Sequence, residues 1–115
     1  MLDNIFCEYL ENEICKAIQI YPTDETKDFW CGGVLLSEPF NTYTTDYIIE
    51  NKQVLLKAYV GKNGQEEYDL ILKFGELALS YQAKNMDIIN CLPNIELTNW
   101  LSIDTNKKII IIHLI

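Results

Sequence analysis

Two runs of β-prone residues, 53–60 and 66–74, flank Asn63-Gly64 in the middle of the chain. An Asn-Gly pair between two such runs is a strong hairpin signal. A two-residue loop is one possible connection, and a three-residue loop over 62–64 with a left-handed Gly64 is another. We favour the second, because it gathers apolar residues on one face and sets opposite charges across from each other. The predicted cross-strand partners are Val54 with Leu72, Leu56 with Leu70, Ala58 with Tyr68, Leu55 with Ile71, Lys57 with Asp69, and Tyr59 with Glu67.

The two faces of this hairpin differ in composition. The face that carries Leu56 and Leu70 is fully apolar, so we expect it to lie on the core. The other face mixes Leu55, Ile71 and Tyr59 with charged residues. It is interpreted either as a half-covered sheet face or as a protein-binding surface, since aromatic and apolar anchors ringed by charge are typical of interfaces.

Apolar residues at three- and four-residue spacing predict an amphipathic helix over 2–19. Asp3 is its expected N-cap. Pro22 should end it, because a proline disfavours helical geometry at the residue before it. The expected buried positions are Leu2, Ile5, Phe6, Tyr9, Leu10, Ile14, Ala17 and Ile18.

The remaining pattern predicts further strands and one more helix. Residues 29–36 read as a buried strand, and residues 42–50 read as a strand because Tyr and Thr side chains alternate there. A short helix is expected over 76–84, and a second hairpin is expected from 100–103 and 108–114. The run 109–112 is all isoleucine, which indicates a strand covered on both faces. Together these elements predict one α+β domain over 1–115, with a mostly antiparallel sheet of five or six strands and the N-terminal helix packed on one face.

Charge changes this picture more than composition does. The net charge is −8 and the chain has no arginine. Residues 1–50 carry ten acidic residues and two lysines, a net of −8, whereas residues 51–115 carry seven of each, a net of zero. An acidic field disfavours binding to nucleic acids and anionic membranes and attracts cationic proteins. The same charge would also serve solubility alone.

The four cysteines form no C-x-x-C pair. On a helix, Cys7 and Cys15 would lie about 12 Å apart, beyond the roughly 7 Å that a disulfide spans. With His113 as the only histidine, no usual zinc spacing occurs. We therefore expect reduced cysteines in a cytoplasmic protein. No apolar run approaches the ~20 residues of a membrane span, and no secretory signal is visible.

Candidate chemistry is sparse. Cys31, His113 and Asp28 could form a nucleophile, a base and an orienting acid on adjacent strands, but Cys31 lies in an apolar stretch and His113 lies close to the end of the chain. Adjacent acids at 24–25 and 66–67 fall in predicted loops or at a hairpin tip, where solvation is the ordinary state. We expect no catalytic residue, cofactor or metal.

Three stretches carry a resemblance: 29–36, 56–75, and the pattern Trp100-x-x-Ile103-Asp104. They resemble small Bacteroidetes-type proteins that are similar to the immunity proteins of bacterial toxin systems. This resemblance implies a protein that binds a cognate toxin domain and blocks its active site. It assigns no functional residue.

The functional hypothesis is therefore a protein-binding module of the immunity type that neutralises a cationic toxin through its acidic surface. An alternative is a structural or regulatory homo-oligomer that dimerises through its last strand. The predicted partner-binding residues are Glu8, Glu11, Asp24, Glu25, Asp28 and Tyr59.

Overall fold

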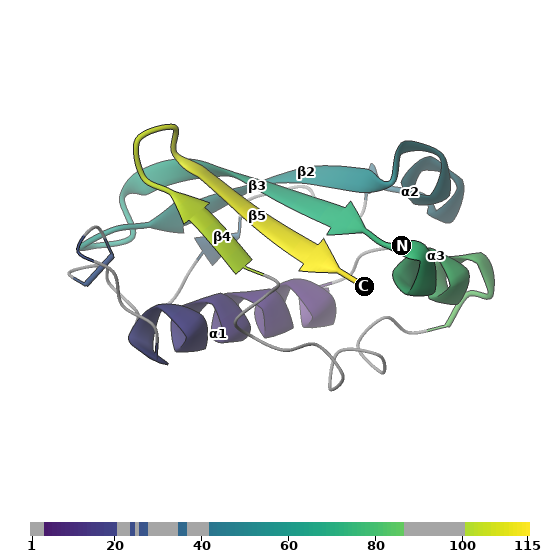
Figure 1. Ribbon diagram of the computed structural model, residues 1–115, viewed down its shortest axis with the longest axis horizontal. Helices are drawn as coiled ribbons and strands as arrows, with labels where there is room; N and C mark the ends of the chain where they lie inside the picture. The colour runs from purple at the N-terminus through teal and green to yellow at the C-terminus, as the bar shows by residue number, and fades with distance from the viewer. Residues whose placement is uncertain (1–3, 21–23, 25, 28–34, 37–41, 87–100) are drawn as a thin grey trace.

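The computed structural model describes residues 4–20, 24, 26–27, 35–36, 42–86 and 101–115. Within these residues, five strands form one mixed sheet in the order β1-β2-β3-β5-β4, and helix α1 crosses one face of it (Figure 1). The predicted α+β fold with a mostly antiparallel sheet and a packed N-terminal helix is confirmed. In chain order the elements are α1 (Asn4–Ile20), β1 (Leu35–Leu36), α2 (Thr45–Asn51), β2 (Gln53–Val60), β3 (Glu66–Phe74), α3 (Glu76–Ala83), β4 (Leu101–Asp104) and β5 (Ile109–Leu114).

The hairpin of β2 and β3 has the predicted register, with all six predicted cross-strand pairs in place. Gly64 adopts a positive φ of 66°, as the predicted turn requires, and its N–H donates to the Gly61 carbonyl at 3.4 Å. Glycine is suited to this left-handed geometry because it has no Cβ. The turn chemistry and the apolar pattern select the same register, and this hairpin is the centre of the sheet.

Helix α1 packs its apolar stripe against the sheet. Phe6, Leu10, Ile14 and Ile18 are buried in the core, as predicted. Ile5 was expected in that stripe, but it is 68% exposed. The helix ends at Ile20, one residue before the position that Pro22 disfavours. The predicted N-cap, Asp3, lies outside the described residues.

The prediction of a strand over 42–50 is wrong, because residues 45–51 form helix α2. The Thr44 hydroxyl oxygen accepts from the Tyr47 N–H at 3.2 Å and caps the helix N-terminus. At the other end Lys52 is left-handed, and its N–H donates to the Ile48 carbonyl at 2.8 Å. Ile48 is the buried residue of α2. The alternation that suggested a strand runs through the odd-numbered positions and misses it.

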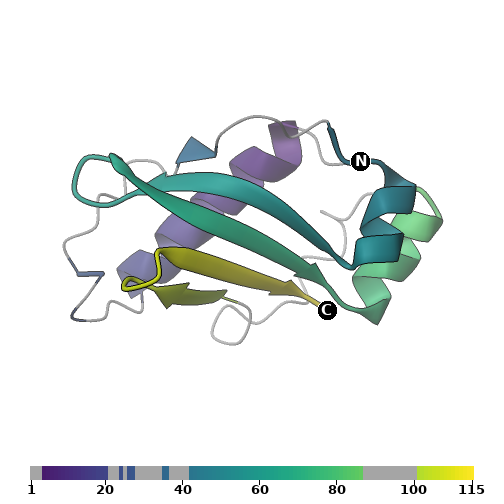
Figure 2. The ribbon, with the colours of Figure 1, turned by 90° about the horizontal axis from the view of Figure 1, so that it is seen from above.

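Helix α3 is confirmed at 76–83, and it lies beside α2 at one end of the sheet (Figure 2). Its buried residues are Ala78 and Gln82, whereas Leu77 is 45% exposed. The helix begins against the end of β5, where the Gly75 N–H donates to the Leu114 carbonyl at 2.6 Å. A Cβ at Gly75 would lie 2.9 Å from that carbonyl oxygen, so glycine permits this close approach.

Strand β5 lies inside the sheet, parallel to β3 and antiparallel to β4. The hairpin of β4 and β5 was predicted, but the parallel pairing with β3 was not. Burial alternates along β5: Ile110 and Ile112 are fully buried, whereas Ile109 and Ile111 are partly exposed. The expectation that the isoleucine run is covered on both faces is therefore wrong.

The predicted strand over 29–36 is described only at Leu35–Leu36, which forms β1 at the sheet edge beside β2. Leu35 is 52% exposed, so this end of the predicted strand is not buried. The rest of that prediction, residues 29–34, lies outside the described residues.

Candidate protein-binding surfaces

The sheet has an inner face, toward α1, and an outer face, away from it. Side chains of paired residues share a face, and alternate residues along a strand point to opposite faces. The inner face is made by Val54, Leu56, Ala58, Val60, Tyr68, Leu70, Leu72, Phe74, Ile110, Ile112 and Leu114, all of them buried. The outer face is made by Leu35, Gln53, Leu55, Lys57, Tyr59, Glu67, Asp69, Ile71, Lys73, Ser102, Asp104, Ile109, Ile111 and His113.

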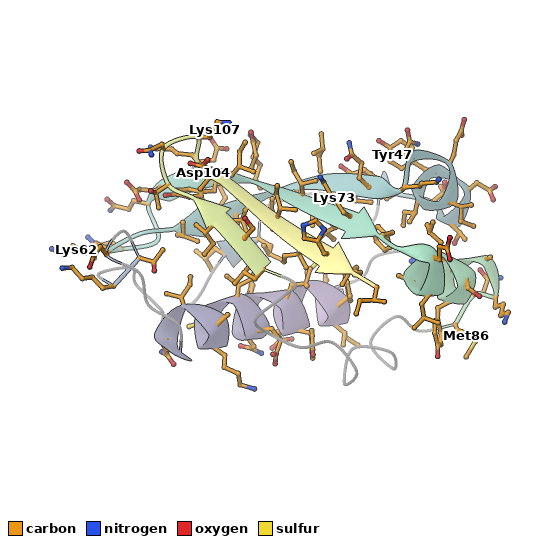
Figure 3. The ribbon with its side chains drawn as sticks, in the orientation of Figure 1. Tyr47, Lys62, Lys73, Met86, Asp104 and Lys107 are labelled. Carbon is orange, nitrogen blue, oxygen red and sulfur yellow. The ribbon has the colours of Figure 1, made fainter. Side chains whose placement is uncertain are left out.

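The outer face is open among the described elements. Seen from above the sheet, no described helix lies over it, and α1 runs behind it (Figure 2). Side chains such as Lys73 and Asp104 project from it on the side away from α1 (Figure 3). Leu55 is 53% exposed. A solvent-exposed leucine in the middle of a strand is therefore part of this surface.

An apolar row crosses the outer face from strand to strand. Leu55 pairs with Ile71, and Ile71 pairs with Ile111, which places the three side chains side by side on β2, β3 and β5. Tyr59 lies farther along β2, between Leu35 and Glu67. Leu55, Ile71 and Tyr59 were predicted as a possible binding surface, whereas Ile111 was not. The unbroken run of isoleucines gave no sign that one of its faces is open.

Charged residues border this apolar row on both sides. Lys57 and Asp69 form a cross-strand ion pair, with both side chains about half exposed. Asp104 lies on β4 next to Ile109, on the same side of the apolar row as Lys57 and Asp69. Lys73 and His113 lie on the other side of the apolar row. The hydrogen bond from Lys57 to Asp69 is the main reason that the pKa of Lys57 is raised. The outer face therefore has Lys73 on one side of the apolar row and Asp69 and Asp104 on the other.

The second candidate surface is the solvent side of α1. Glu8 is exposed there, and Glu13 forms an ion pair with Lys16 at 3.6 Å. Asp24, in the described residues that follow, is also exposed. Of these side chains, Glu8 and Asp24 suit a cationic partner, because complementary charge steers the encounter with it.

Glu11 differs from the other predicted acids, because it has a structural partner. Its carboxylate accepts a hydrogen bond of 2.8 Å from the Leu36 backbone N–H. This bond joins α1 to the edge strand β1. Burial raises the pKa of Glu11, and the charge of Glu8 adds to that, while the bond from Leu36 acts in the opposite direction. Glu11 is thus engaged within the fold.

The predicted partner-binding set is divided by the fold. Glu8 and Glu11 lie on α1, beneath the inner face, whereas Tyr59 lies on the outer face. One flat partner surface cannot contact both Glu8 and Tyr59. Glu25 and Asp28 lie outside the described residues.

The candidate catalytic groups are only partly described. His113 is exposed on the outer face, and Cys31 and Asp28 lie outside the described residues. Glu66 and Glu67 are neighbours on β3, so their side chains point to opposite faces rather than into one site. Within the described ranges, no cluster of three or more His, Cys, Asp or Glu side chains could hold a metal ion.

Cys15 is disulfide-bonded, so the expectation that the cysteines are all reduced is wrong. Cys7, two turns away on the same helix, is a buried thiol that is not part of a disulfide. The partner of Cys15 lies outside the described residues.

No helix among the described residues is long and apolar enough to cross a membrane. Comparison with protein-family models, curated proteins and solved structures found no match for this chain. The surfaces themselves therefore carry the functional argument.

Proposed function

We propose that this protein is a non-catalytic binding module of the immunity type, which binds and neutralises a cationic toxin domain. The observation that carries the proposal is the acidic charge of the N-terminal part: the whole net charge of −8 arises from residues 1–50. Glu8 and Asp24 present part of it to solvent. Such a field speeds the encounter with a basic partner and disfavours like-charged ones.

The resemblance of residues 56–75 to immunity-like proteins supports the same function. That stretch contains most of the hairpin of β2 and β3, on which the sheet is built. The acidic surface lies across the sheet from Tyr59, so we assign the contact with the cationic partner to Glu8 and Asp24, together with Glu25 and Asp28. Tyr59 then belongs to a different surface, and Glu11 contributes by holding α1 to β1.

The test begins with capture of partners from the native organism on the tagged protein, followed by their identification by mass spectrometry. Binding of a captured basic domain is then measured by calorimetry at low and high salt. Glu8→Gln with Asp24→Asn should weaken affinity roughly 2- to 30-fold and reduce its salt dependence, since exposed ion pairs contribute about 0.2–1 kcal/mol each.

A matched control neutralises two exposed acids elsewhere. Glu66→Gln with Glu76→Gln changes the net charge by the same amount but alters β3 and α3 instead. This control should keep nearly the wild-type affinity. Equal losses in both double variants would mean that only the total charge matters, and an unchanged affinity in the first would remove Glu8 and Asp24 from the interface.

A further inference from the structure

We infer that the outer face of the sheet binds a second copy of this chain, so that two sheets stack face to face in a two-fold dimer. Three properties of this face favour such a dimer: its open apolar row, its balanced charge and the order in which its charges lie along the strands. The dimer is independent of the proposed function, because the acidic side of α1 lies across the sheet.

The apolar row needs an apolar partner. Leu55 is 53% exposed, and Ile71 and Ile111 beside it are only partly covered. Ile109 extends this patch by one position on β5, next to Asp69. Covering such side chains removes apolar surface from water, which favours association. A second sheet that brings the same row is the partner with the matching shape, because stacked sheets pack about 10 Å apart with interleaved side chains.

The net charge of the outer face differs from that of the whole chain. It carries two lysines and three acidic residues, a net of −1, whereas the chain carries −8. A cationic partner gains little from this face. Two copies can stack here with little repulsion, since the acidic surface of α1 then points away from the contact.

The order of charges along β3 makes the face complementary to itself. Ile71 lies midway between Asp69 and Lys73 on the same face. A two-fold axis in the plane of contact, along the apolar row, exchanges the two directions along the strands. It places Lys73 of each copy against Asp69 of the other, and the apolar row against its own counterpart. A closed interface of this kind uses one patch twice.

The size of the face indicates a weak dimer. At about 4.8 Å between strands and about 3.3 Å per residue, the face is roughly 20 Å wide and about 30 Å long along β3. This is roughly 600 Å² in plan, near the lower end of the specific interfaces, which bury about 800 Å² on each partner. We therefore expect association that depends on concentration over the micromolar to millimolar range.

The experiment is sedimentation equilibrium of the full chain from about 10 µM to about 1 mM, a range that brackets weak association. The apparent mass should rise from the 13.4 kDa of one chain toward twice that value. Leu55→Glu should weaken dimerisation about tenfold or more, because each copy then buries an unpaired charge at the contact. Leu77→Glu is the matched control: it places the same charge at a leucine of α3 with 45% exposure, and it should dimerise like the wild type.

A charge exchange tests the geometry of the contact. Lys73→Asp should weaken the dimer, and Asp69→Lys added to it should restore part of the affinity, because the cross-copy pair is rebuilt in reverse. A monomer at every concentration would overturn the inference, as would equal effects of Leu55→Glu and Leu77→Glu. Circular dichroism and thermal melting of each variant establish that it is folded, which is expected for substitutions at exposed positions.

Discussion

The inner and outer faces of the β2–β3 hairpin come from the same two strands, yet they have different environments. On the inner face Val54, Leu70 and Leu72 are fully buried under α1. On the outer face Leu55, the neighbour of Val54, is 53% exposed. Apolar character alone therefore does not place a strand residue in the core. The element that packs over a sheet face determines whether its side chains are buried, and α1 is the one described helix that crosses the sheet (Figure 1).

The largest expected difference between the faces is in stability. Leu70→Ala removes a fully buried side chain from the inner face, and it should lower the free energy of unfolding by about 2–5 kcal/mol. Leu55→Ala on the outer face should change it by about 0.5 kcal/mol or less in the monomer. Urea unfolding at low protein concentration measures both. Similar losses would mean that the outer face is as well packed as the inner one.

The second-largest expected effect is the loss of stability when the disulfide of Cys15, on α1, is reduced. Reduction of the Cys15 disulfide under native conditions should lower the free energy of unfolding by about 2–4 kcal/mol, since the cross-link restricts the unfolded chain. Cys7→Ser is the comparison for a thiol without a cross-link: it should leave the response to reductant intact. Melting curves with and without reductant, together with mass spectrometry after alkylation, check this. Four alkylated cysteines in the native protein would contradict the disulfide.

The smallest effect separates two acids of α1. Glu11→Ala should destabilise the fold by about 1–2 kcal/mol, because the Leu36 N–H loses its acceptor. Glu8→Ala should change stability by about 0.5 kcal/mol or less, because Glu8 is exposed. Chemical unfolding at neutral pH measures the pair. Equal values for the two variants would remove the structural role of Glu11.

The pH dependence of Glu11 sharpens the same prediction. Since burial raises its pKa in the folded state, the folded protein holds this proton more tightly than the unfolded chain. The part of the Glu11 contribution that comes from this tighter proton binding is full below the unfolded pKa, about 4.3, and is lost as the pH rises through the raised folded value, whereas the hydrogen bond from the Leu36 N–H remains. Glu11→Gln cannot titrate, and its amide oxygen can still accept from Leu36. The free energy of unfolding of Glu11→Gln, relative to that of the wild type, should therefore increase with pH over this range.

Local signals predicted much of the fold. The hairpin register followed from Gly64 and from opposed charges, and α1 followed from apolar spacing and Pro22. The prediction of a strand over 42–50 was wrong because the alternation of Tyr and Thr residues was given more weight than the one capping residue, Thr44. In the folded chain, Tyr43 instead donates its hydroxyl hydrogen to the Leu55 carbonyl and packs against Tyr47, with ring centroids 5.3 Å apart.

The candidate sites were less predictable than the fold. The acidic charge could be read directly from the sequence, but the engagement of Glu11 by Leu36 joins residues 25 positions apart. Likewise, the separation of Glu8 from Tyr59 depends on which face of the sheet α1 covers. No local pattern encodes either relation.

By itself the sequence determined the position of each element with clear apolar periodicity, the register of the central hairpin and the uneven distribution of charge. These depend on turn geometry, side-chain alternation and composition, which act between residues close in the chain. Only the tertiary structure decided that β5 enters the sheet parallel to β3 and that Ile111 completes an open apolar row. The reason is physical: strand order and face coverage are set by packing between segments far apart in sequence, where one apolar strand can satisfy several neighbours equally well.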